Sequence, residues 1–161
     1  MANVWLQHRS SIAGVWELTS FDIWDRNGSG RKLLSQPNGV EPLGRSVITP
    51  GGFSSAHNVN PQTLRQYSQV SLSEATDAQL AEILRAVSHY CGQVQLFEES
   101  DGTLRLEITV EAASDPQRLG SIQKRNLVYS NADGQTTMLL KPVGDFYLKA
   151  CLFDPTLPEY C

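Results

Sequence analysis

The feature of this 161-residue sequence that most limits its fold is a series of short segments in which apolar and polar residues alternate. In segment 103–112, Leu104, Leu106, Ile108 and Val110 alternate with polar residues. A period of two is typical of β-strands with one buried face. Asn-Gly, Asp-Gly and Gly-Gly pairs separate several segments and favour tight turns between antiparallel strands. The pattern therefore predicts an antiparallel all-β protein.

About eight strands are predicted along the chain. They lie at 14–24, 44–50, 52–59, 93–99, 103–112, 120–130, 136–142 and 145–153. Glycines, prolines and Asn-Gly pairs at 25–44 predict a long loop, and the polar segment 60–75 is predicted to be irregular. Sequential antiparallel strands in this number form either a barrel or a sandwich. A barrel of about eight strands has an interior wide enough for side chains or one small ligand.

One helix is predicted at about 76–90, between the third and fourth strands. Thr76 and Gln79 have the spacing of a capping box, and Gly92 is a stop signal just after the last turn. Four apolar residues recur at helical spacing and form one stripe. They are Leu80, Ile83, Leu84 and Val87.

The charge and composition exclude several classes of partner. A net charge of −4 leaves no basic surplus to neutralise nucleic-acid phosphates or an anionic membrane. No window is apolar enough for a transmembrane helix, and the N-terminal residues lack the features of a signal peptide. We predict a cytoplasmic protein with one domain over 1–161, its barrel at about 12–153, and no membrane insertion. A homodimer is compatible with the sequence.

No cofactor or metal ion is predicted. The sequence has no P-loop, dinucleotide-binding fingerprint or nucleophile elbow. Its three histidines are far apart: His8 is expected in a loose N-terminus, His89 at the end of the helix, and His57 on a strand. The cysteines, Cys91, Cys151 and Cys161, have neither zinc-site nor disulfide-framework spacing and are predicted to be structural or terminal residues.

Several motifs resemble those of a known family. Gly14 and Trp16 resemble the Gly-x-Trp signature on the first strand of lipocalins. "IAGVWELTSF", "PLGRSVITPGGFSSAHN", "YCGQVQL" and "QKRNLVYS" follow in the order seen in the lipocalin-like domain family. The resemblance spans residues 12–153 and implies a β-barrel that encloses a small-molecule cavity, in an intracellular protein of secondary metabolism. It also implies that Trp16 plugs the closed end of the barrel, with Arg125 packed on its ring.

Three polar residues on predicted strands are candidate catalytic groups: His57, Glu107 and Arg125. His57 points either into the cavity, where it could shuttle protons, or toward water as an ordinary strand histidine. Glu107 lies in water if the leucines of its strand are inside. It becomes a buried acid with a raised pKa if the polar face lines the cavity. If Glu107 and Arg125 both faced inward, they would form an ion pair.

Aromatic residues are spread over elements that could meet around a barrel mouth. They are either ordinary core residues or the lining of a site for an apolar molecule. The candidate substrate-binding residues are Trp16, Trp24, Phe53, Tyr90 and Tyr147, with Tyr67 and Phe146 as further members of the set.

Three functions are compatible with these features. The first is a cofactor-free isomerase or cyclase acting on an apolar polyketide- or terpenoid-type intermediate, a substrate class that rests on the family resemblance. The cavity would restrict the substrate to a near-reactive conformation, while His57, Arg125 and Tyr90 stabilise developing charge. The alternatives are an intracellular carrier of an apolar metabolite and a structural subunit of a partner enzyme.

Overall fold

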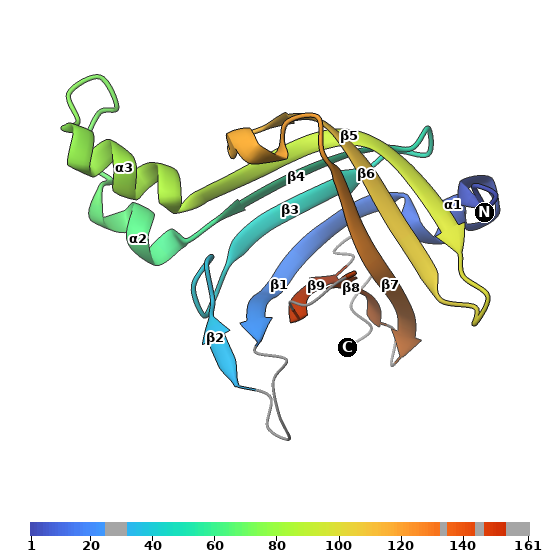
Figure 1. Ribbon diagram of the computed structural model, residues 1–161. Coiled ribbons are helices and arrows are strands. Elements are labelled where there is room, and N and C mark those ends of the chain that lie inside the picture. The colour runs from blue at the N-terminus through green and yellow to red at the C-terminus, as the bar shows by residue number, and fades with distance from the viewer. Residues whose placement is uncertain (25–31, 133–134, 144–146, 154–161) are drawn as a thin grey trace.

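The computed structural model describes residues 1–24, 32–132, 135–143 and 147–153, without the side chains of 142 and 147–153. These parts of the chain form one antiparallel sheet with the strand order β2-β1-β3-β4-β5-β6-β7-β8-β9 (Figure 1). The strands are β1 (Gly14–Trp24), β2 (Leu33–Ser35), β3 (Leu43–Ile48), β4 (Phe53–Val59), β5 (Val87–Glu98), β6 (Leu104–Ala113), β7 (Ile122–Ala132), β8 (Gln135–Pro142) and β9 (Tyr147–Phe153). The helices are α1 (Trp5–Ile12), α2 (Pro61–Gln66) and α3 (Asp77–Arg85), with a 3-10 turn η1 (Pro116–Arg118).

The sheet closes on itself because the last strand returns to the first. β9 pairs with residues 17–24 of β1, while β3 pairs with residues 14–17 on the other edge of β1. Strands β1 and β3 to β9 therefore form the antiparallel barrel that the sequence predicts. Within the described residues, the short strand β2 pairs only with the end of β1, where Trp24 faces Leu33. The prediction of a long loop over 25–44 is therefore wrong at residues 33–35, and β3 begins inside the predicted loop, at Leu43.

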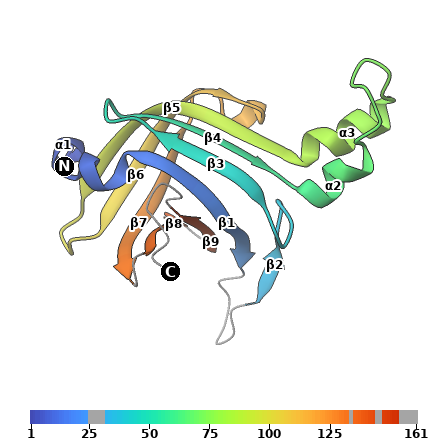
Figure 2. The ribbon, with the colours of Figure 1, turned by 180° about the vertical axis from the view of Figure 1, so that it is seen from behind.

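Helix α1 and the large apolar side chains lie at one end of the barrel. Trp5 and Ile12 of α1 are buried, and the Trp5 Nε1 donates to the carbonyl oxygen of Pro50 at 3.1 Å. The expected loose N-terminus is therefore wrong, and His8 lies within a helix that packs on the core. Figure 2 shows α1 at the opposite end of the barrel from α2 and α3. The core residues around α1 include Trp16, Ile48, Leu96, Leu106, Ile108, Leu127 and Met138.

The helix predicted at 76–90 ends at Arg85, and β5 begins at Val87. Residues 87–93 pair with the whole length of β4, so cross-strand hydrogen bonds outweigh the local helical pattern of this segment. Gly92 lies inside β5 and is not a helix stop, and His89 lies on a strand and not at a helix end. Segment 60–75, predicted to be irregular, contains α2. The Asn60 side chain caps this helix by accepting hydrogen bonds from the backbone N–H groups of Gln62 and Thr63.

The capping box of α3 is confirmed, and it has an expected effect on local stability. The Thr76 Oγ1 accepts from the Gln79 backbone N at 3.3 Å, and the Gln79 Oε1 accepts from the Thr76 N at 2.9 Å. Since α3 buries no residue, Thr76→Ala is expected to destabilise this helix by about 1 kcal/mol. Amide hydrogen exchange in α3 should accelerate about fivefold, with global unfolding unchanged. Equal acceleration in the core strands would contradict this.

No helix in the described part of the chain has the length and apolar character needed to cross a membrane.

Candidate functional site

The barrel interior changes character away from α1, because the inward-facing residues become small or polar. Ser46 on β3, and Ala56 and Asn58 on β4, stand where longer apolar side chains would fill the barrel. They leave an inner cavity of about 50 Å³, which has room for more than one water molecule. Its apolar walls are Leu18, Phe21, Ala56 and Leu140, and its polar walls are Ser46, Asn58, Ser88, Tyr90, Arg118 and Arg125.

A wider outer cavity of about 460 Å³ lies beside the inner one. Phe21, Ser88 and Arg118 line both cavities, so the two adjoin each other at these residues. The outer walls come from β1, the turn at residues 37–38, the end of α3, the start of β5, and the segment from the end of β6 to η1. The combined space lies in the range of small-molecule sites, which is about 300–1,000 Å³.

Arg125 on β7 faces the inner cavity. It stands opposite Leu106 in the sheet, and Leu106 is a buried core residue on the inner face. Its guanidinium donates to the carbonyl oxygen of Lys124 at 2.7 Å and to the Gln123 Oε1 at 3.3 Å. Burial lowers the pKa of Arg125 below its ordinary value; Tyr90 opposes this shift, and the charge of Arg118 adds to it. The side chain stays protonated at neutral pH.

Arg118 and Tyr90 stand together at the junction of the two cavities. The guanidinium carbon of Arg118 lies 5.6 Å from the centroid of the Tyr90 ring, which is within cation–π distance. The Arg118 Nε also lies 3.5 Å from the Asp115 Oδ2. Tyr90 is thus the aromatic candidate that does line the cavity. Arg118 carried no sequence signal, because it lies in a short connection without alternation.

His57 does not face the cavity, which corrects its expected role there. Its neighbours Ala56 and Asn58 point inward, so the strand period turns His57 outward. The exposed ring stacks on His89, with centroids 5.8 Å apart and planes at 19°, and its Nε2 lies 3.1 Å from the Ser55 Oγ. The structure therefore matches the alternative of an ordinary strand histidine.

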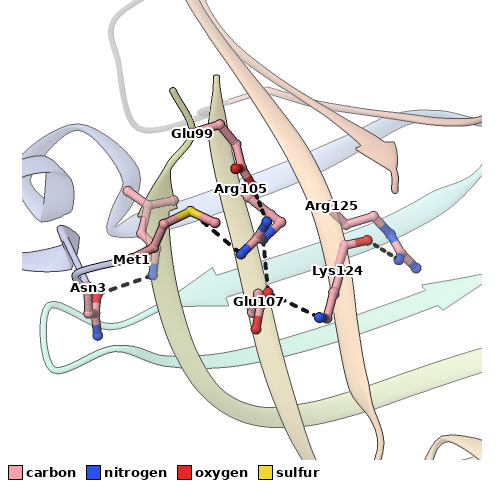
Figure 3. A network of polar contacts seen from close by, with 8 residues as sticks. Met1, Asn3, Glu99, Arg105, Glu107, Lys124 and Arg125 are labelled. Carbon is pink, nitrogen blue, oxygen red and sulfur yellow. Dashed lines mark hydrogen bonds and ion pairs between the residues drawn. The ribbon is translucent and has the colours of Figure 1, made fainter. Parts of the chain in front are cut away.

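Glu107 also lies outside the barrel, because the leucines of β6 occupy the inside, as the simpler alternative predicted. Its Oε1 lies 2.9 Å from the Arg105 Nε and 3.5 Å from the Lys124 Nζ. Figure 3 shows this group on one face, with Arg125 extending away from it. Glu107 is nevertheless buried, since these side chains cover it on the outer surface. The expectation that Glu107 faces the cavity is wrong, and it forms no ion pair with Arg125.

Trp16 lies in the core and is not part of the cavity wall. Its side chain is 1% exposed, and its Nε1 donates to the carbonyl oxygen of Ile12 at 2.9 Å. This supports its expected position as a plug and corrects its place among the substrate-binding candidates. The Trp16 ring packs edge to face on Tyr129, with centroids 6.4 Å apart. Among the described residues, no guanidinium stacks on this ring, so the expected pairing with Arg125 is wrong.

The other aromatic candidates have different positions. Phe53 alternates with the inward-facing Ser54, so it lies on the outer face of β4. Trp24 is half-buried at the end of β1, beyond the cavity-lining Phe21. Tyr67 donates to Glu82 and joins α2 to α3. Phe146, the side chain of Tyr147 and the cysteine side chains at 151 and 161 lie outside what the structure describes.

Comparison with known proteins identifies a family. A family model described as a lipocalin-like domain matches residues 13–147, which is most of the chain. Among solved structures, the amine binding protein of Rhodnius prolixus, in its tryptamine complex, is 13% identical with a TM-score of 0.42. The match covers 91% of this chain and 65% of that one, so the chain spans less than two thirds of that protein. A search of curated proteins found no match.

Proposed function

We propose that this chain, which belongs to the lipocalin-like domain family, binds a small organic molecule inside its barrel. The observation that carries the proposal is that the inner and outer cavities adjoin and share Phe21, Ser88 and Arg118 as walls. We expect a molecule that enters through the outer cavity to reach the apolar wall formed by Leu18, Ala56 and Leu140. This arrangement has the mixture of apolar walls and few polar groups that is typical of small-molecule sites.

Every polar group on the wall of the inner cavity can donate a hydrogen bond, and two of them, Arg118 and Arg125, can only donate. Arg118, Arg125 and Tyr90 stand at one side of the cavity, and Phe21 and Leu140 provide apolar walls. The expected ligand therefore has an apolar body and an oxygen that accepts hydrogen bonds. Each Å² of apolar ligand surface removed from water would contribute about 25 cal/mol to the binding free energy. The hydrogen-bond donors of the site are already in position, which lowers the cost of ordering them.

A second candidate function is catalysis without a cofactor, as an isomerase or cyclase. The observation that favours it is the half-buried Arg125 on the cavity wall. A positioned cation in a site of low dielectric constant stabilises negative charge that develops on a carbonyl oxygen, and an enclosed cavity restricts substrate conformations. His57 and Glu107 have no part in this proposal because both face away from the cavity. An apolar secondary-metabolite intermediate remains the predicted substrate.

A blocking substitution tests the proposal. Ser88 lines both cavities, so Ser88→Phe is expected to fill the passage between them. The matched control is His89→Phe, one position along β5 on the exposed outer face. Each protein would be incubated with a small-molecule extract of its source cells and washed. Retained molecules would then be quantified by mass spectrometry.

The wild-type chain and His89→Phe are expected to retain the same molecule, and Ser88→Phe to retain about tenfold less, which corresponds to 1.4 kcal/mol. Equal retention by a folded Ser88→Phe variant would overturn the proposal. The recovered molecule also separates the two candidates, because a carrier returns the supplied compound unchanged. An isomerase or cyclase returns a compound of equal mass with a different retention time.

A further inference from the structure

The described walls of the inner cavity carry more positive charge than negative charge. Two of its wall residues, Arg118 and Arg125, are cations, and among the residues described as its lining none is a carboxylate. This contrasts with the chain as a whole, whose net charge is −4. A local excess of one sign inside a protein of the opposite sign needs an explanation, because an uncompensated charge removed from water is costly.

Among the described arginines that are half-buried, Arg105, Arg118 and Arg125, the last is distinguished by its partners. Arg45 pairs with Glu17 at 3.0 Å, and Arg105 pairs with both Glu99 and Glu107. Arg118 has Asp115 at 3.5 Å. Within the described parts of the chain, Arg125 has no carboxylate partner. Its only acceptors there are two neutral oxygens, although a guanidinium has five N–H donors.

The exposure of these arginines makes the contrast stronger. Arg45 has a partner although its side chain is 48% exposed and could be hydrated by solvent. Arg125 is half-buried and lies on a wall shared with Leu18, Phe21 and Leu140. A charge in such surroundings gains more from an anion than an exposed charge does, since the local dielectric constant is lower.

We propose that the ligand of this site is a small apolar molecule with one carboxylate, which binds to Arg125 in the inner cavity. This inference rests on the proposed function and names its ligand class. The planar guanidinium matches the two oxygens of a carboxylate. Arg118, whose charge Asp115 partly balances, lies at the junction with the outer cavity and adds a weaker attraction. The apolar body of the ligand packs against Phe21 and Leu140.

One carboxylate fits the site better than a phosphate or a cation. The inner cavity, at about 50 Å³, is small and partly apolar, so it favours a compact monoanion over a strongly hydrated dianion. A cationic amine would face two guanidiniums, of which only Arg118 has an acid beside it, and that acid, Asp115, lines the outer cavity. The carboxylate is therefore the group whose charge, shape and size all match Arg125.

Three test ligands with the same aromatic body examine the inference: naphthoate, naphthamide and naphthylmethylamine. Their affinities for the full chain would be measured by isothermal titration calorimetry at neutral pH and low salt. Naphthoate is expected to bind about tenfold to a hundredfold more tightly than naphthamide, the range that a charged hydrogen bond supports. The amine is expected to bind more weakly than the amide.

The substitution Arg125→Gln is expected to remove the preference for naphthoate and to leave the affinity for naphthamide within about twofold. The matched control is Arg45→Gln, an exposed arginine on the outside of β3, which should keep the full preference. Arg125→Lys keeps the charge without the planar fork and should retain part of the preference. If Arg125→Gln does not fold, the inference is tested by the ratio of naphthoate to naphthamide affinity in the wild-type chain and in the Arg125→Lys variant.

A wild-type chain that binds naphthoate no better than naphthamide, including one that binds neither, overturns the inference. A preference that survives in folded Arg125→Gln overturns the assignment to Arg125. Both results are distinguishable from failure of the proposed function. That failure is measured by the Ser88→Phe experiment, which depends on retained molecules of any charge.

Discussion

The substitution Gly92→Ala is expected to destabilise the protein by about 3 kcal/mol or more, at the upper end of the range for overpacked interiors. A Cβ at this position would lie 1.9 Å from the carbonyl oxygen and 2.8 Å from the carbonyl carbon of Thr109. Both atoms belong to the backbone of β6, so no side-chain rotation relieves the contact. Gly92 also lies at the register shift between β5 and β6, where the two backbones approach closely.

Chemical denaturation followed by circular dichroism would measure this loss. The matched control is Gly51→Ala, because the nearest atom to a Cβ there is the Thr49 Oγ1 at 3.8 Å, an ordinary contact. The control is expected to unfold within about 0.5 kcal/mol of the wild-type chain. A similarly small change for Gly92→Ala would contradict the close approach of the β5 and β6 backbones at Gly92 and Thr109.

The substitution Trp16→Ala is expected to reduce the free energy of unfolding by about 3–5 kcal/mol. The side chain is 1% exposed and lies in the core with Ile12 and Leu106. Its removal leaves a large cavity and also leaves the carbonyl oxygen of Ile12 without its donor. Trp16→Phe keeps most of the volume and loses the hydrogen bond, so a smaller loss of about 1–3 kcal/mol is expected.

Ligand binding separates this structural role from a binding role for Trp16. Below its unfolding temperature, the Trp16→Phe variant is expected to bind naphthoate within about twofold of the wild-type affinity, since Trp16 does not line the cavity. Unfolding would be measured by guanidinium titration and binding by calorimetry. A large loss of affinity in a fully folded variant would return Trp16 to the set of ligand contacts.

Some elements could be predicted almost residue by residue. Strand β1 has its predicted bounds of 14–24, and the Gly51-Gly52 pair separates β3 from β4 as expected. The leucines of β6 face inward, as in the alternative that placed the leucines inside the barrel and Glu107 outside. In each case the signal lies within two to eleven neighbouring residues: it is either an alternation with a period of two or a glycine turn. Such a signal is sufficient because local backbone geometry determines strands and tight turns.

Other features depend on partners that are distant in the chain. Residues 87–90 have a helical pattern but form the start of β5, because β4 and β6 offer cross-strand hydrogen bonds there. Helix α1 has almost no amphipathic pattern. It forms where Trp5 and Ile12 can bury themselves against the end of the barrel. Local propensity is weak beside such tertiary contacts.

The sequence by itself determined that this chain forms antiparallel strands around an apolar interior, because alternation and turn residues act between near neighbours. Only the tertiary structure decided which polar side chains reach that interior. Arg125 and Glu107 lie on neighbouring strands, yet the pairing of Leu106 with Arg125 puts one inside and the other outside. Arg118 reaches the same cavity from the connection between β6 and β7. Register and barrel closure set these positions, and both depend on contacts between residues far apart in the chain.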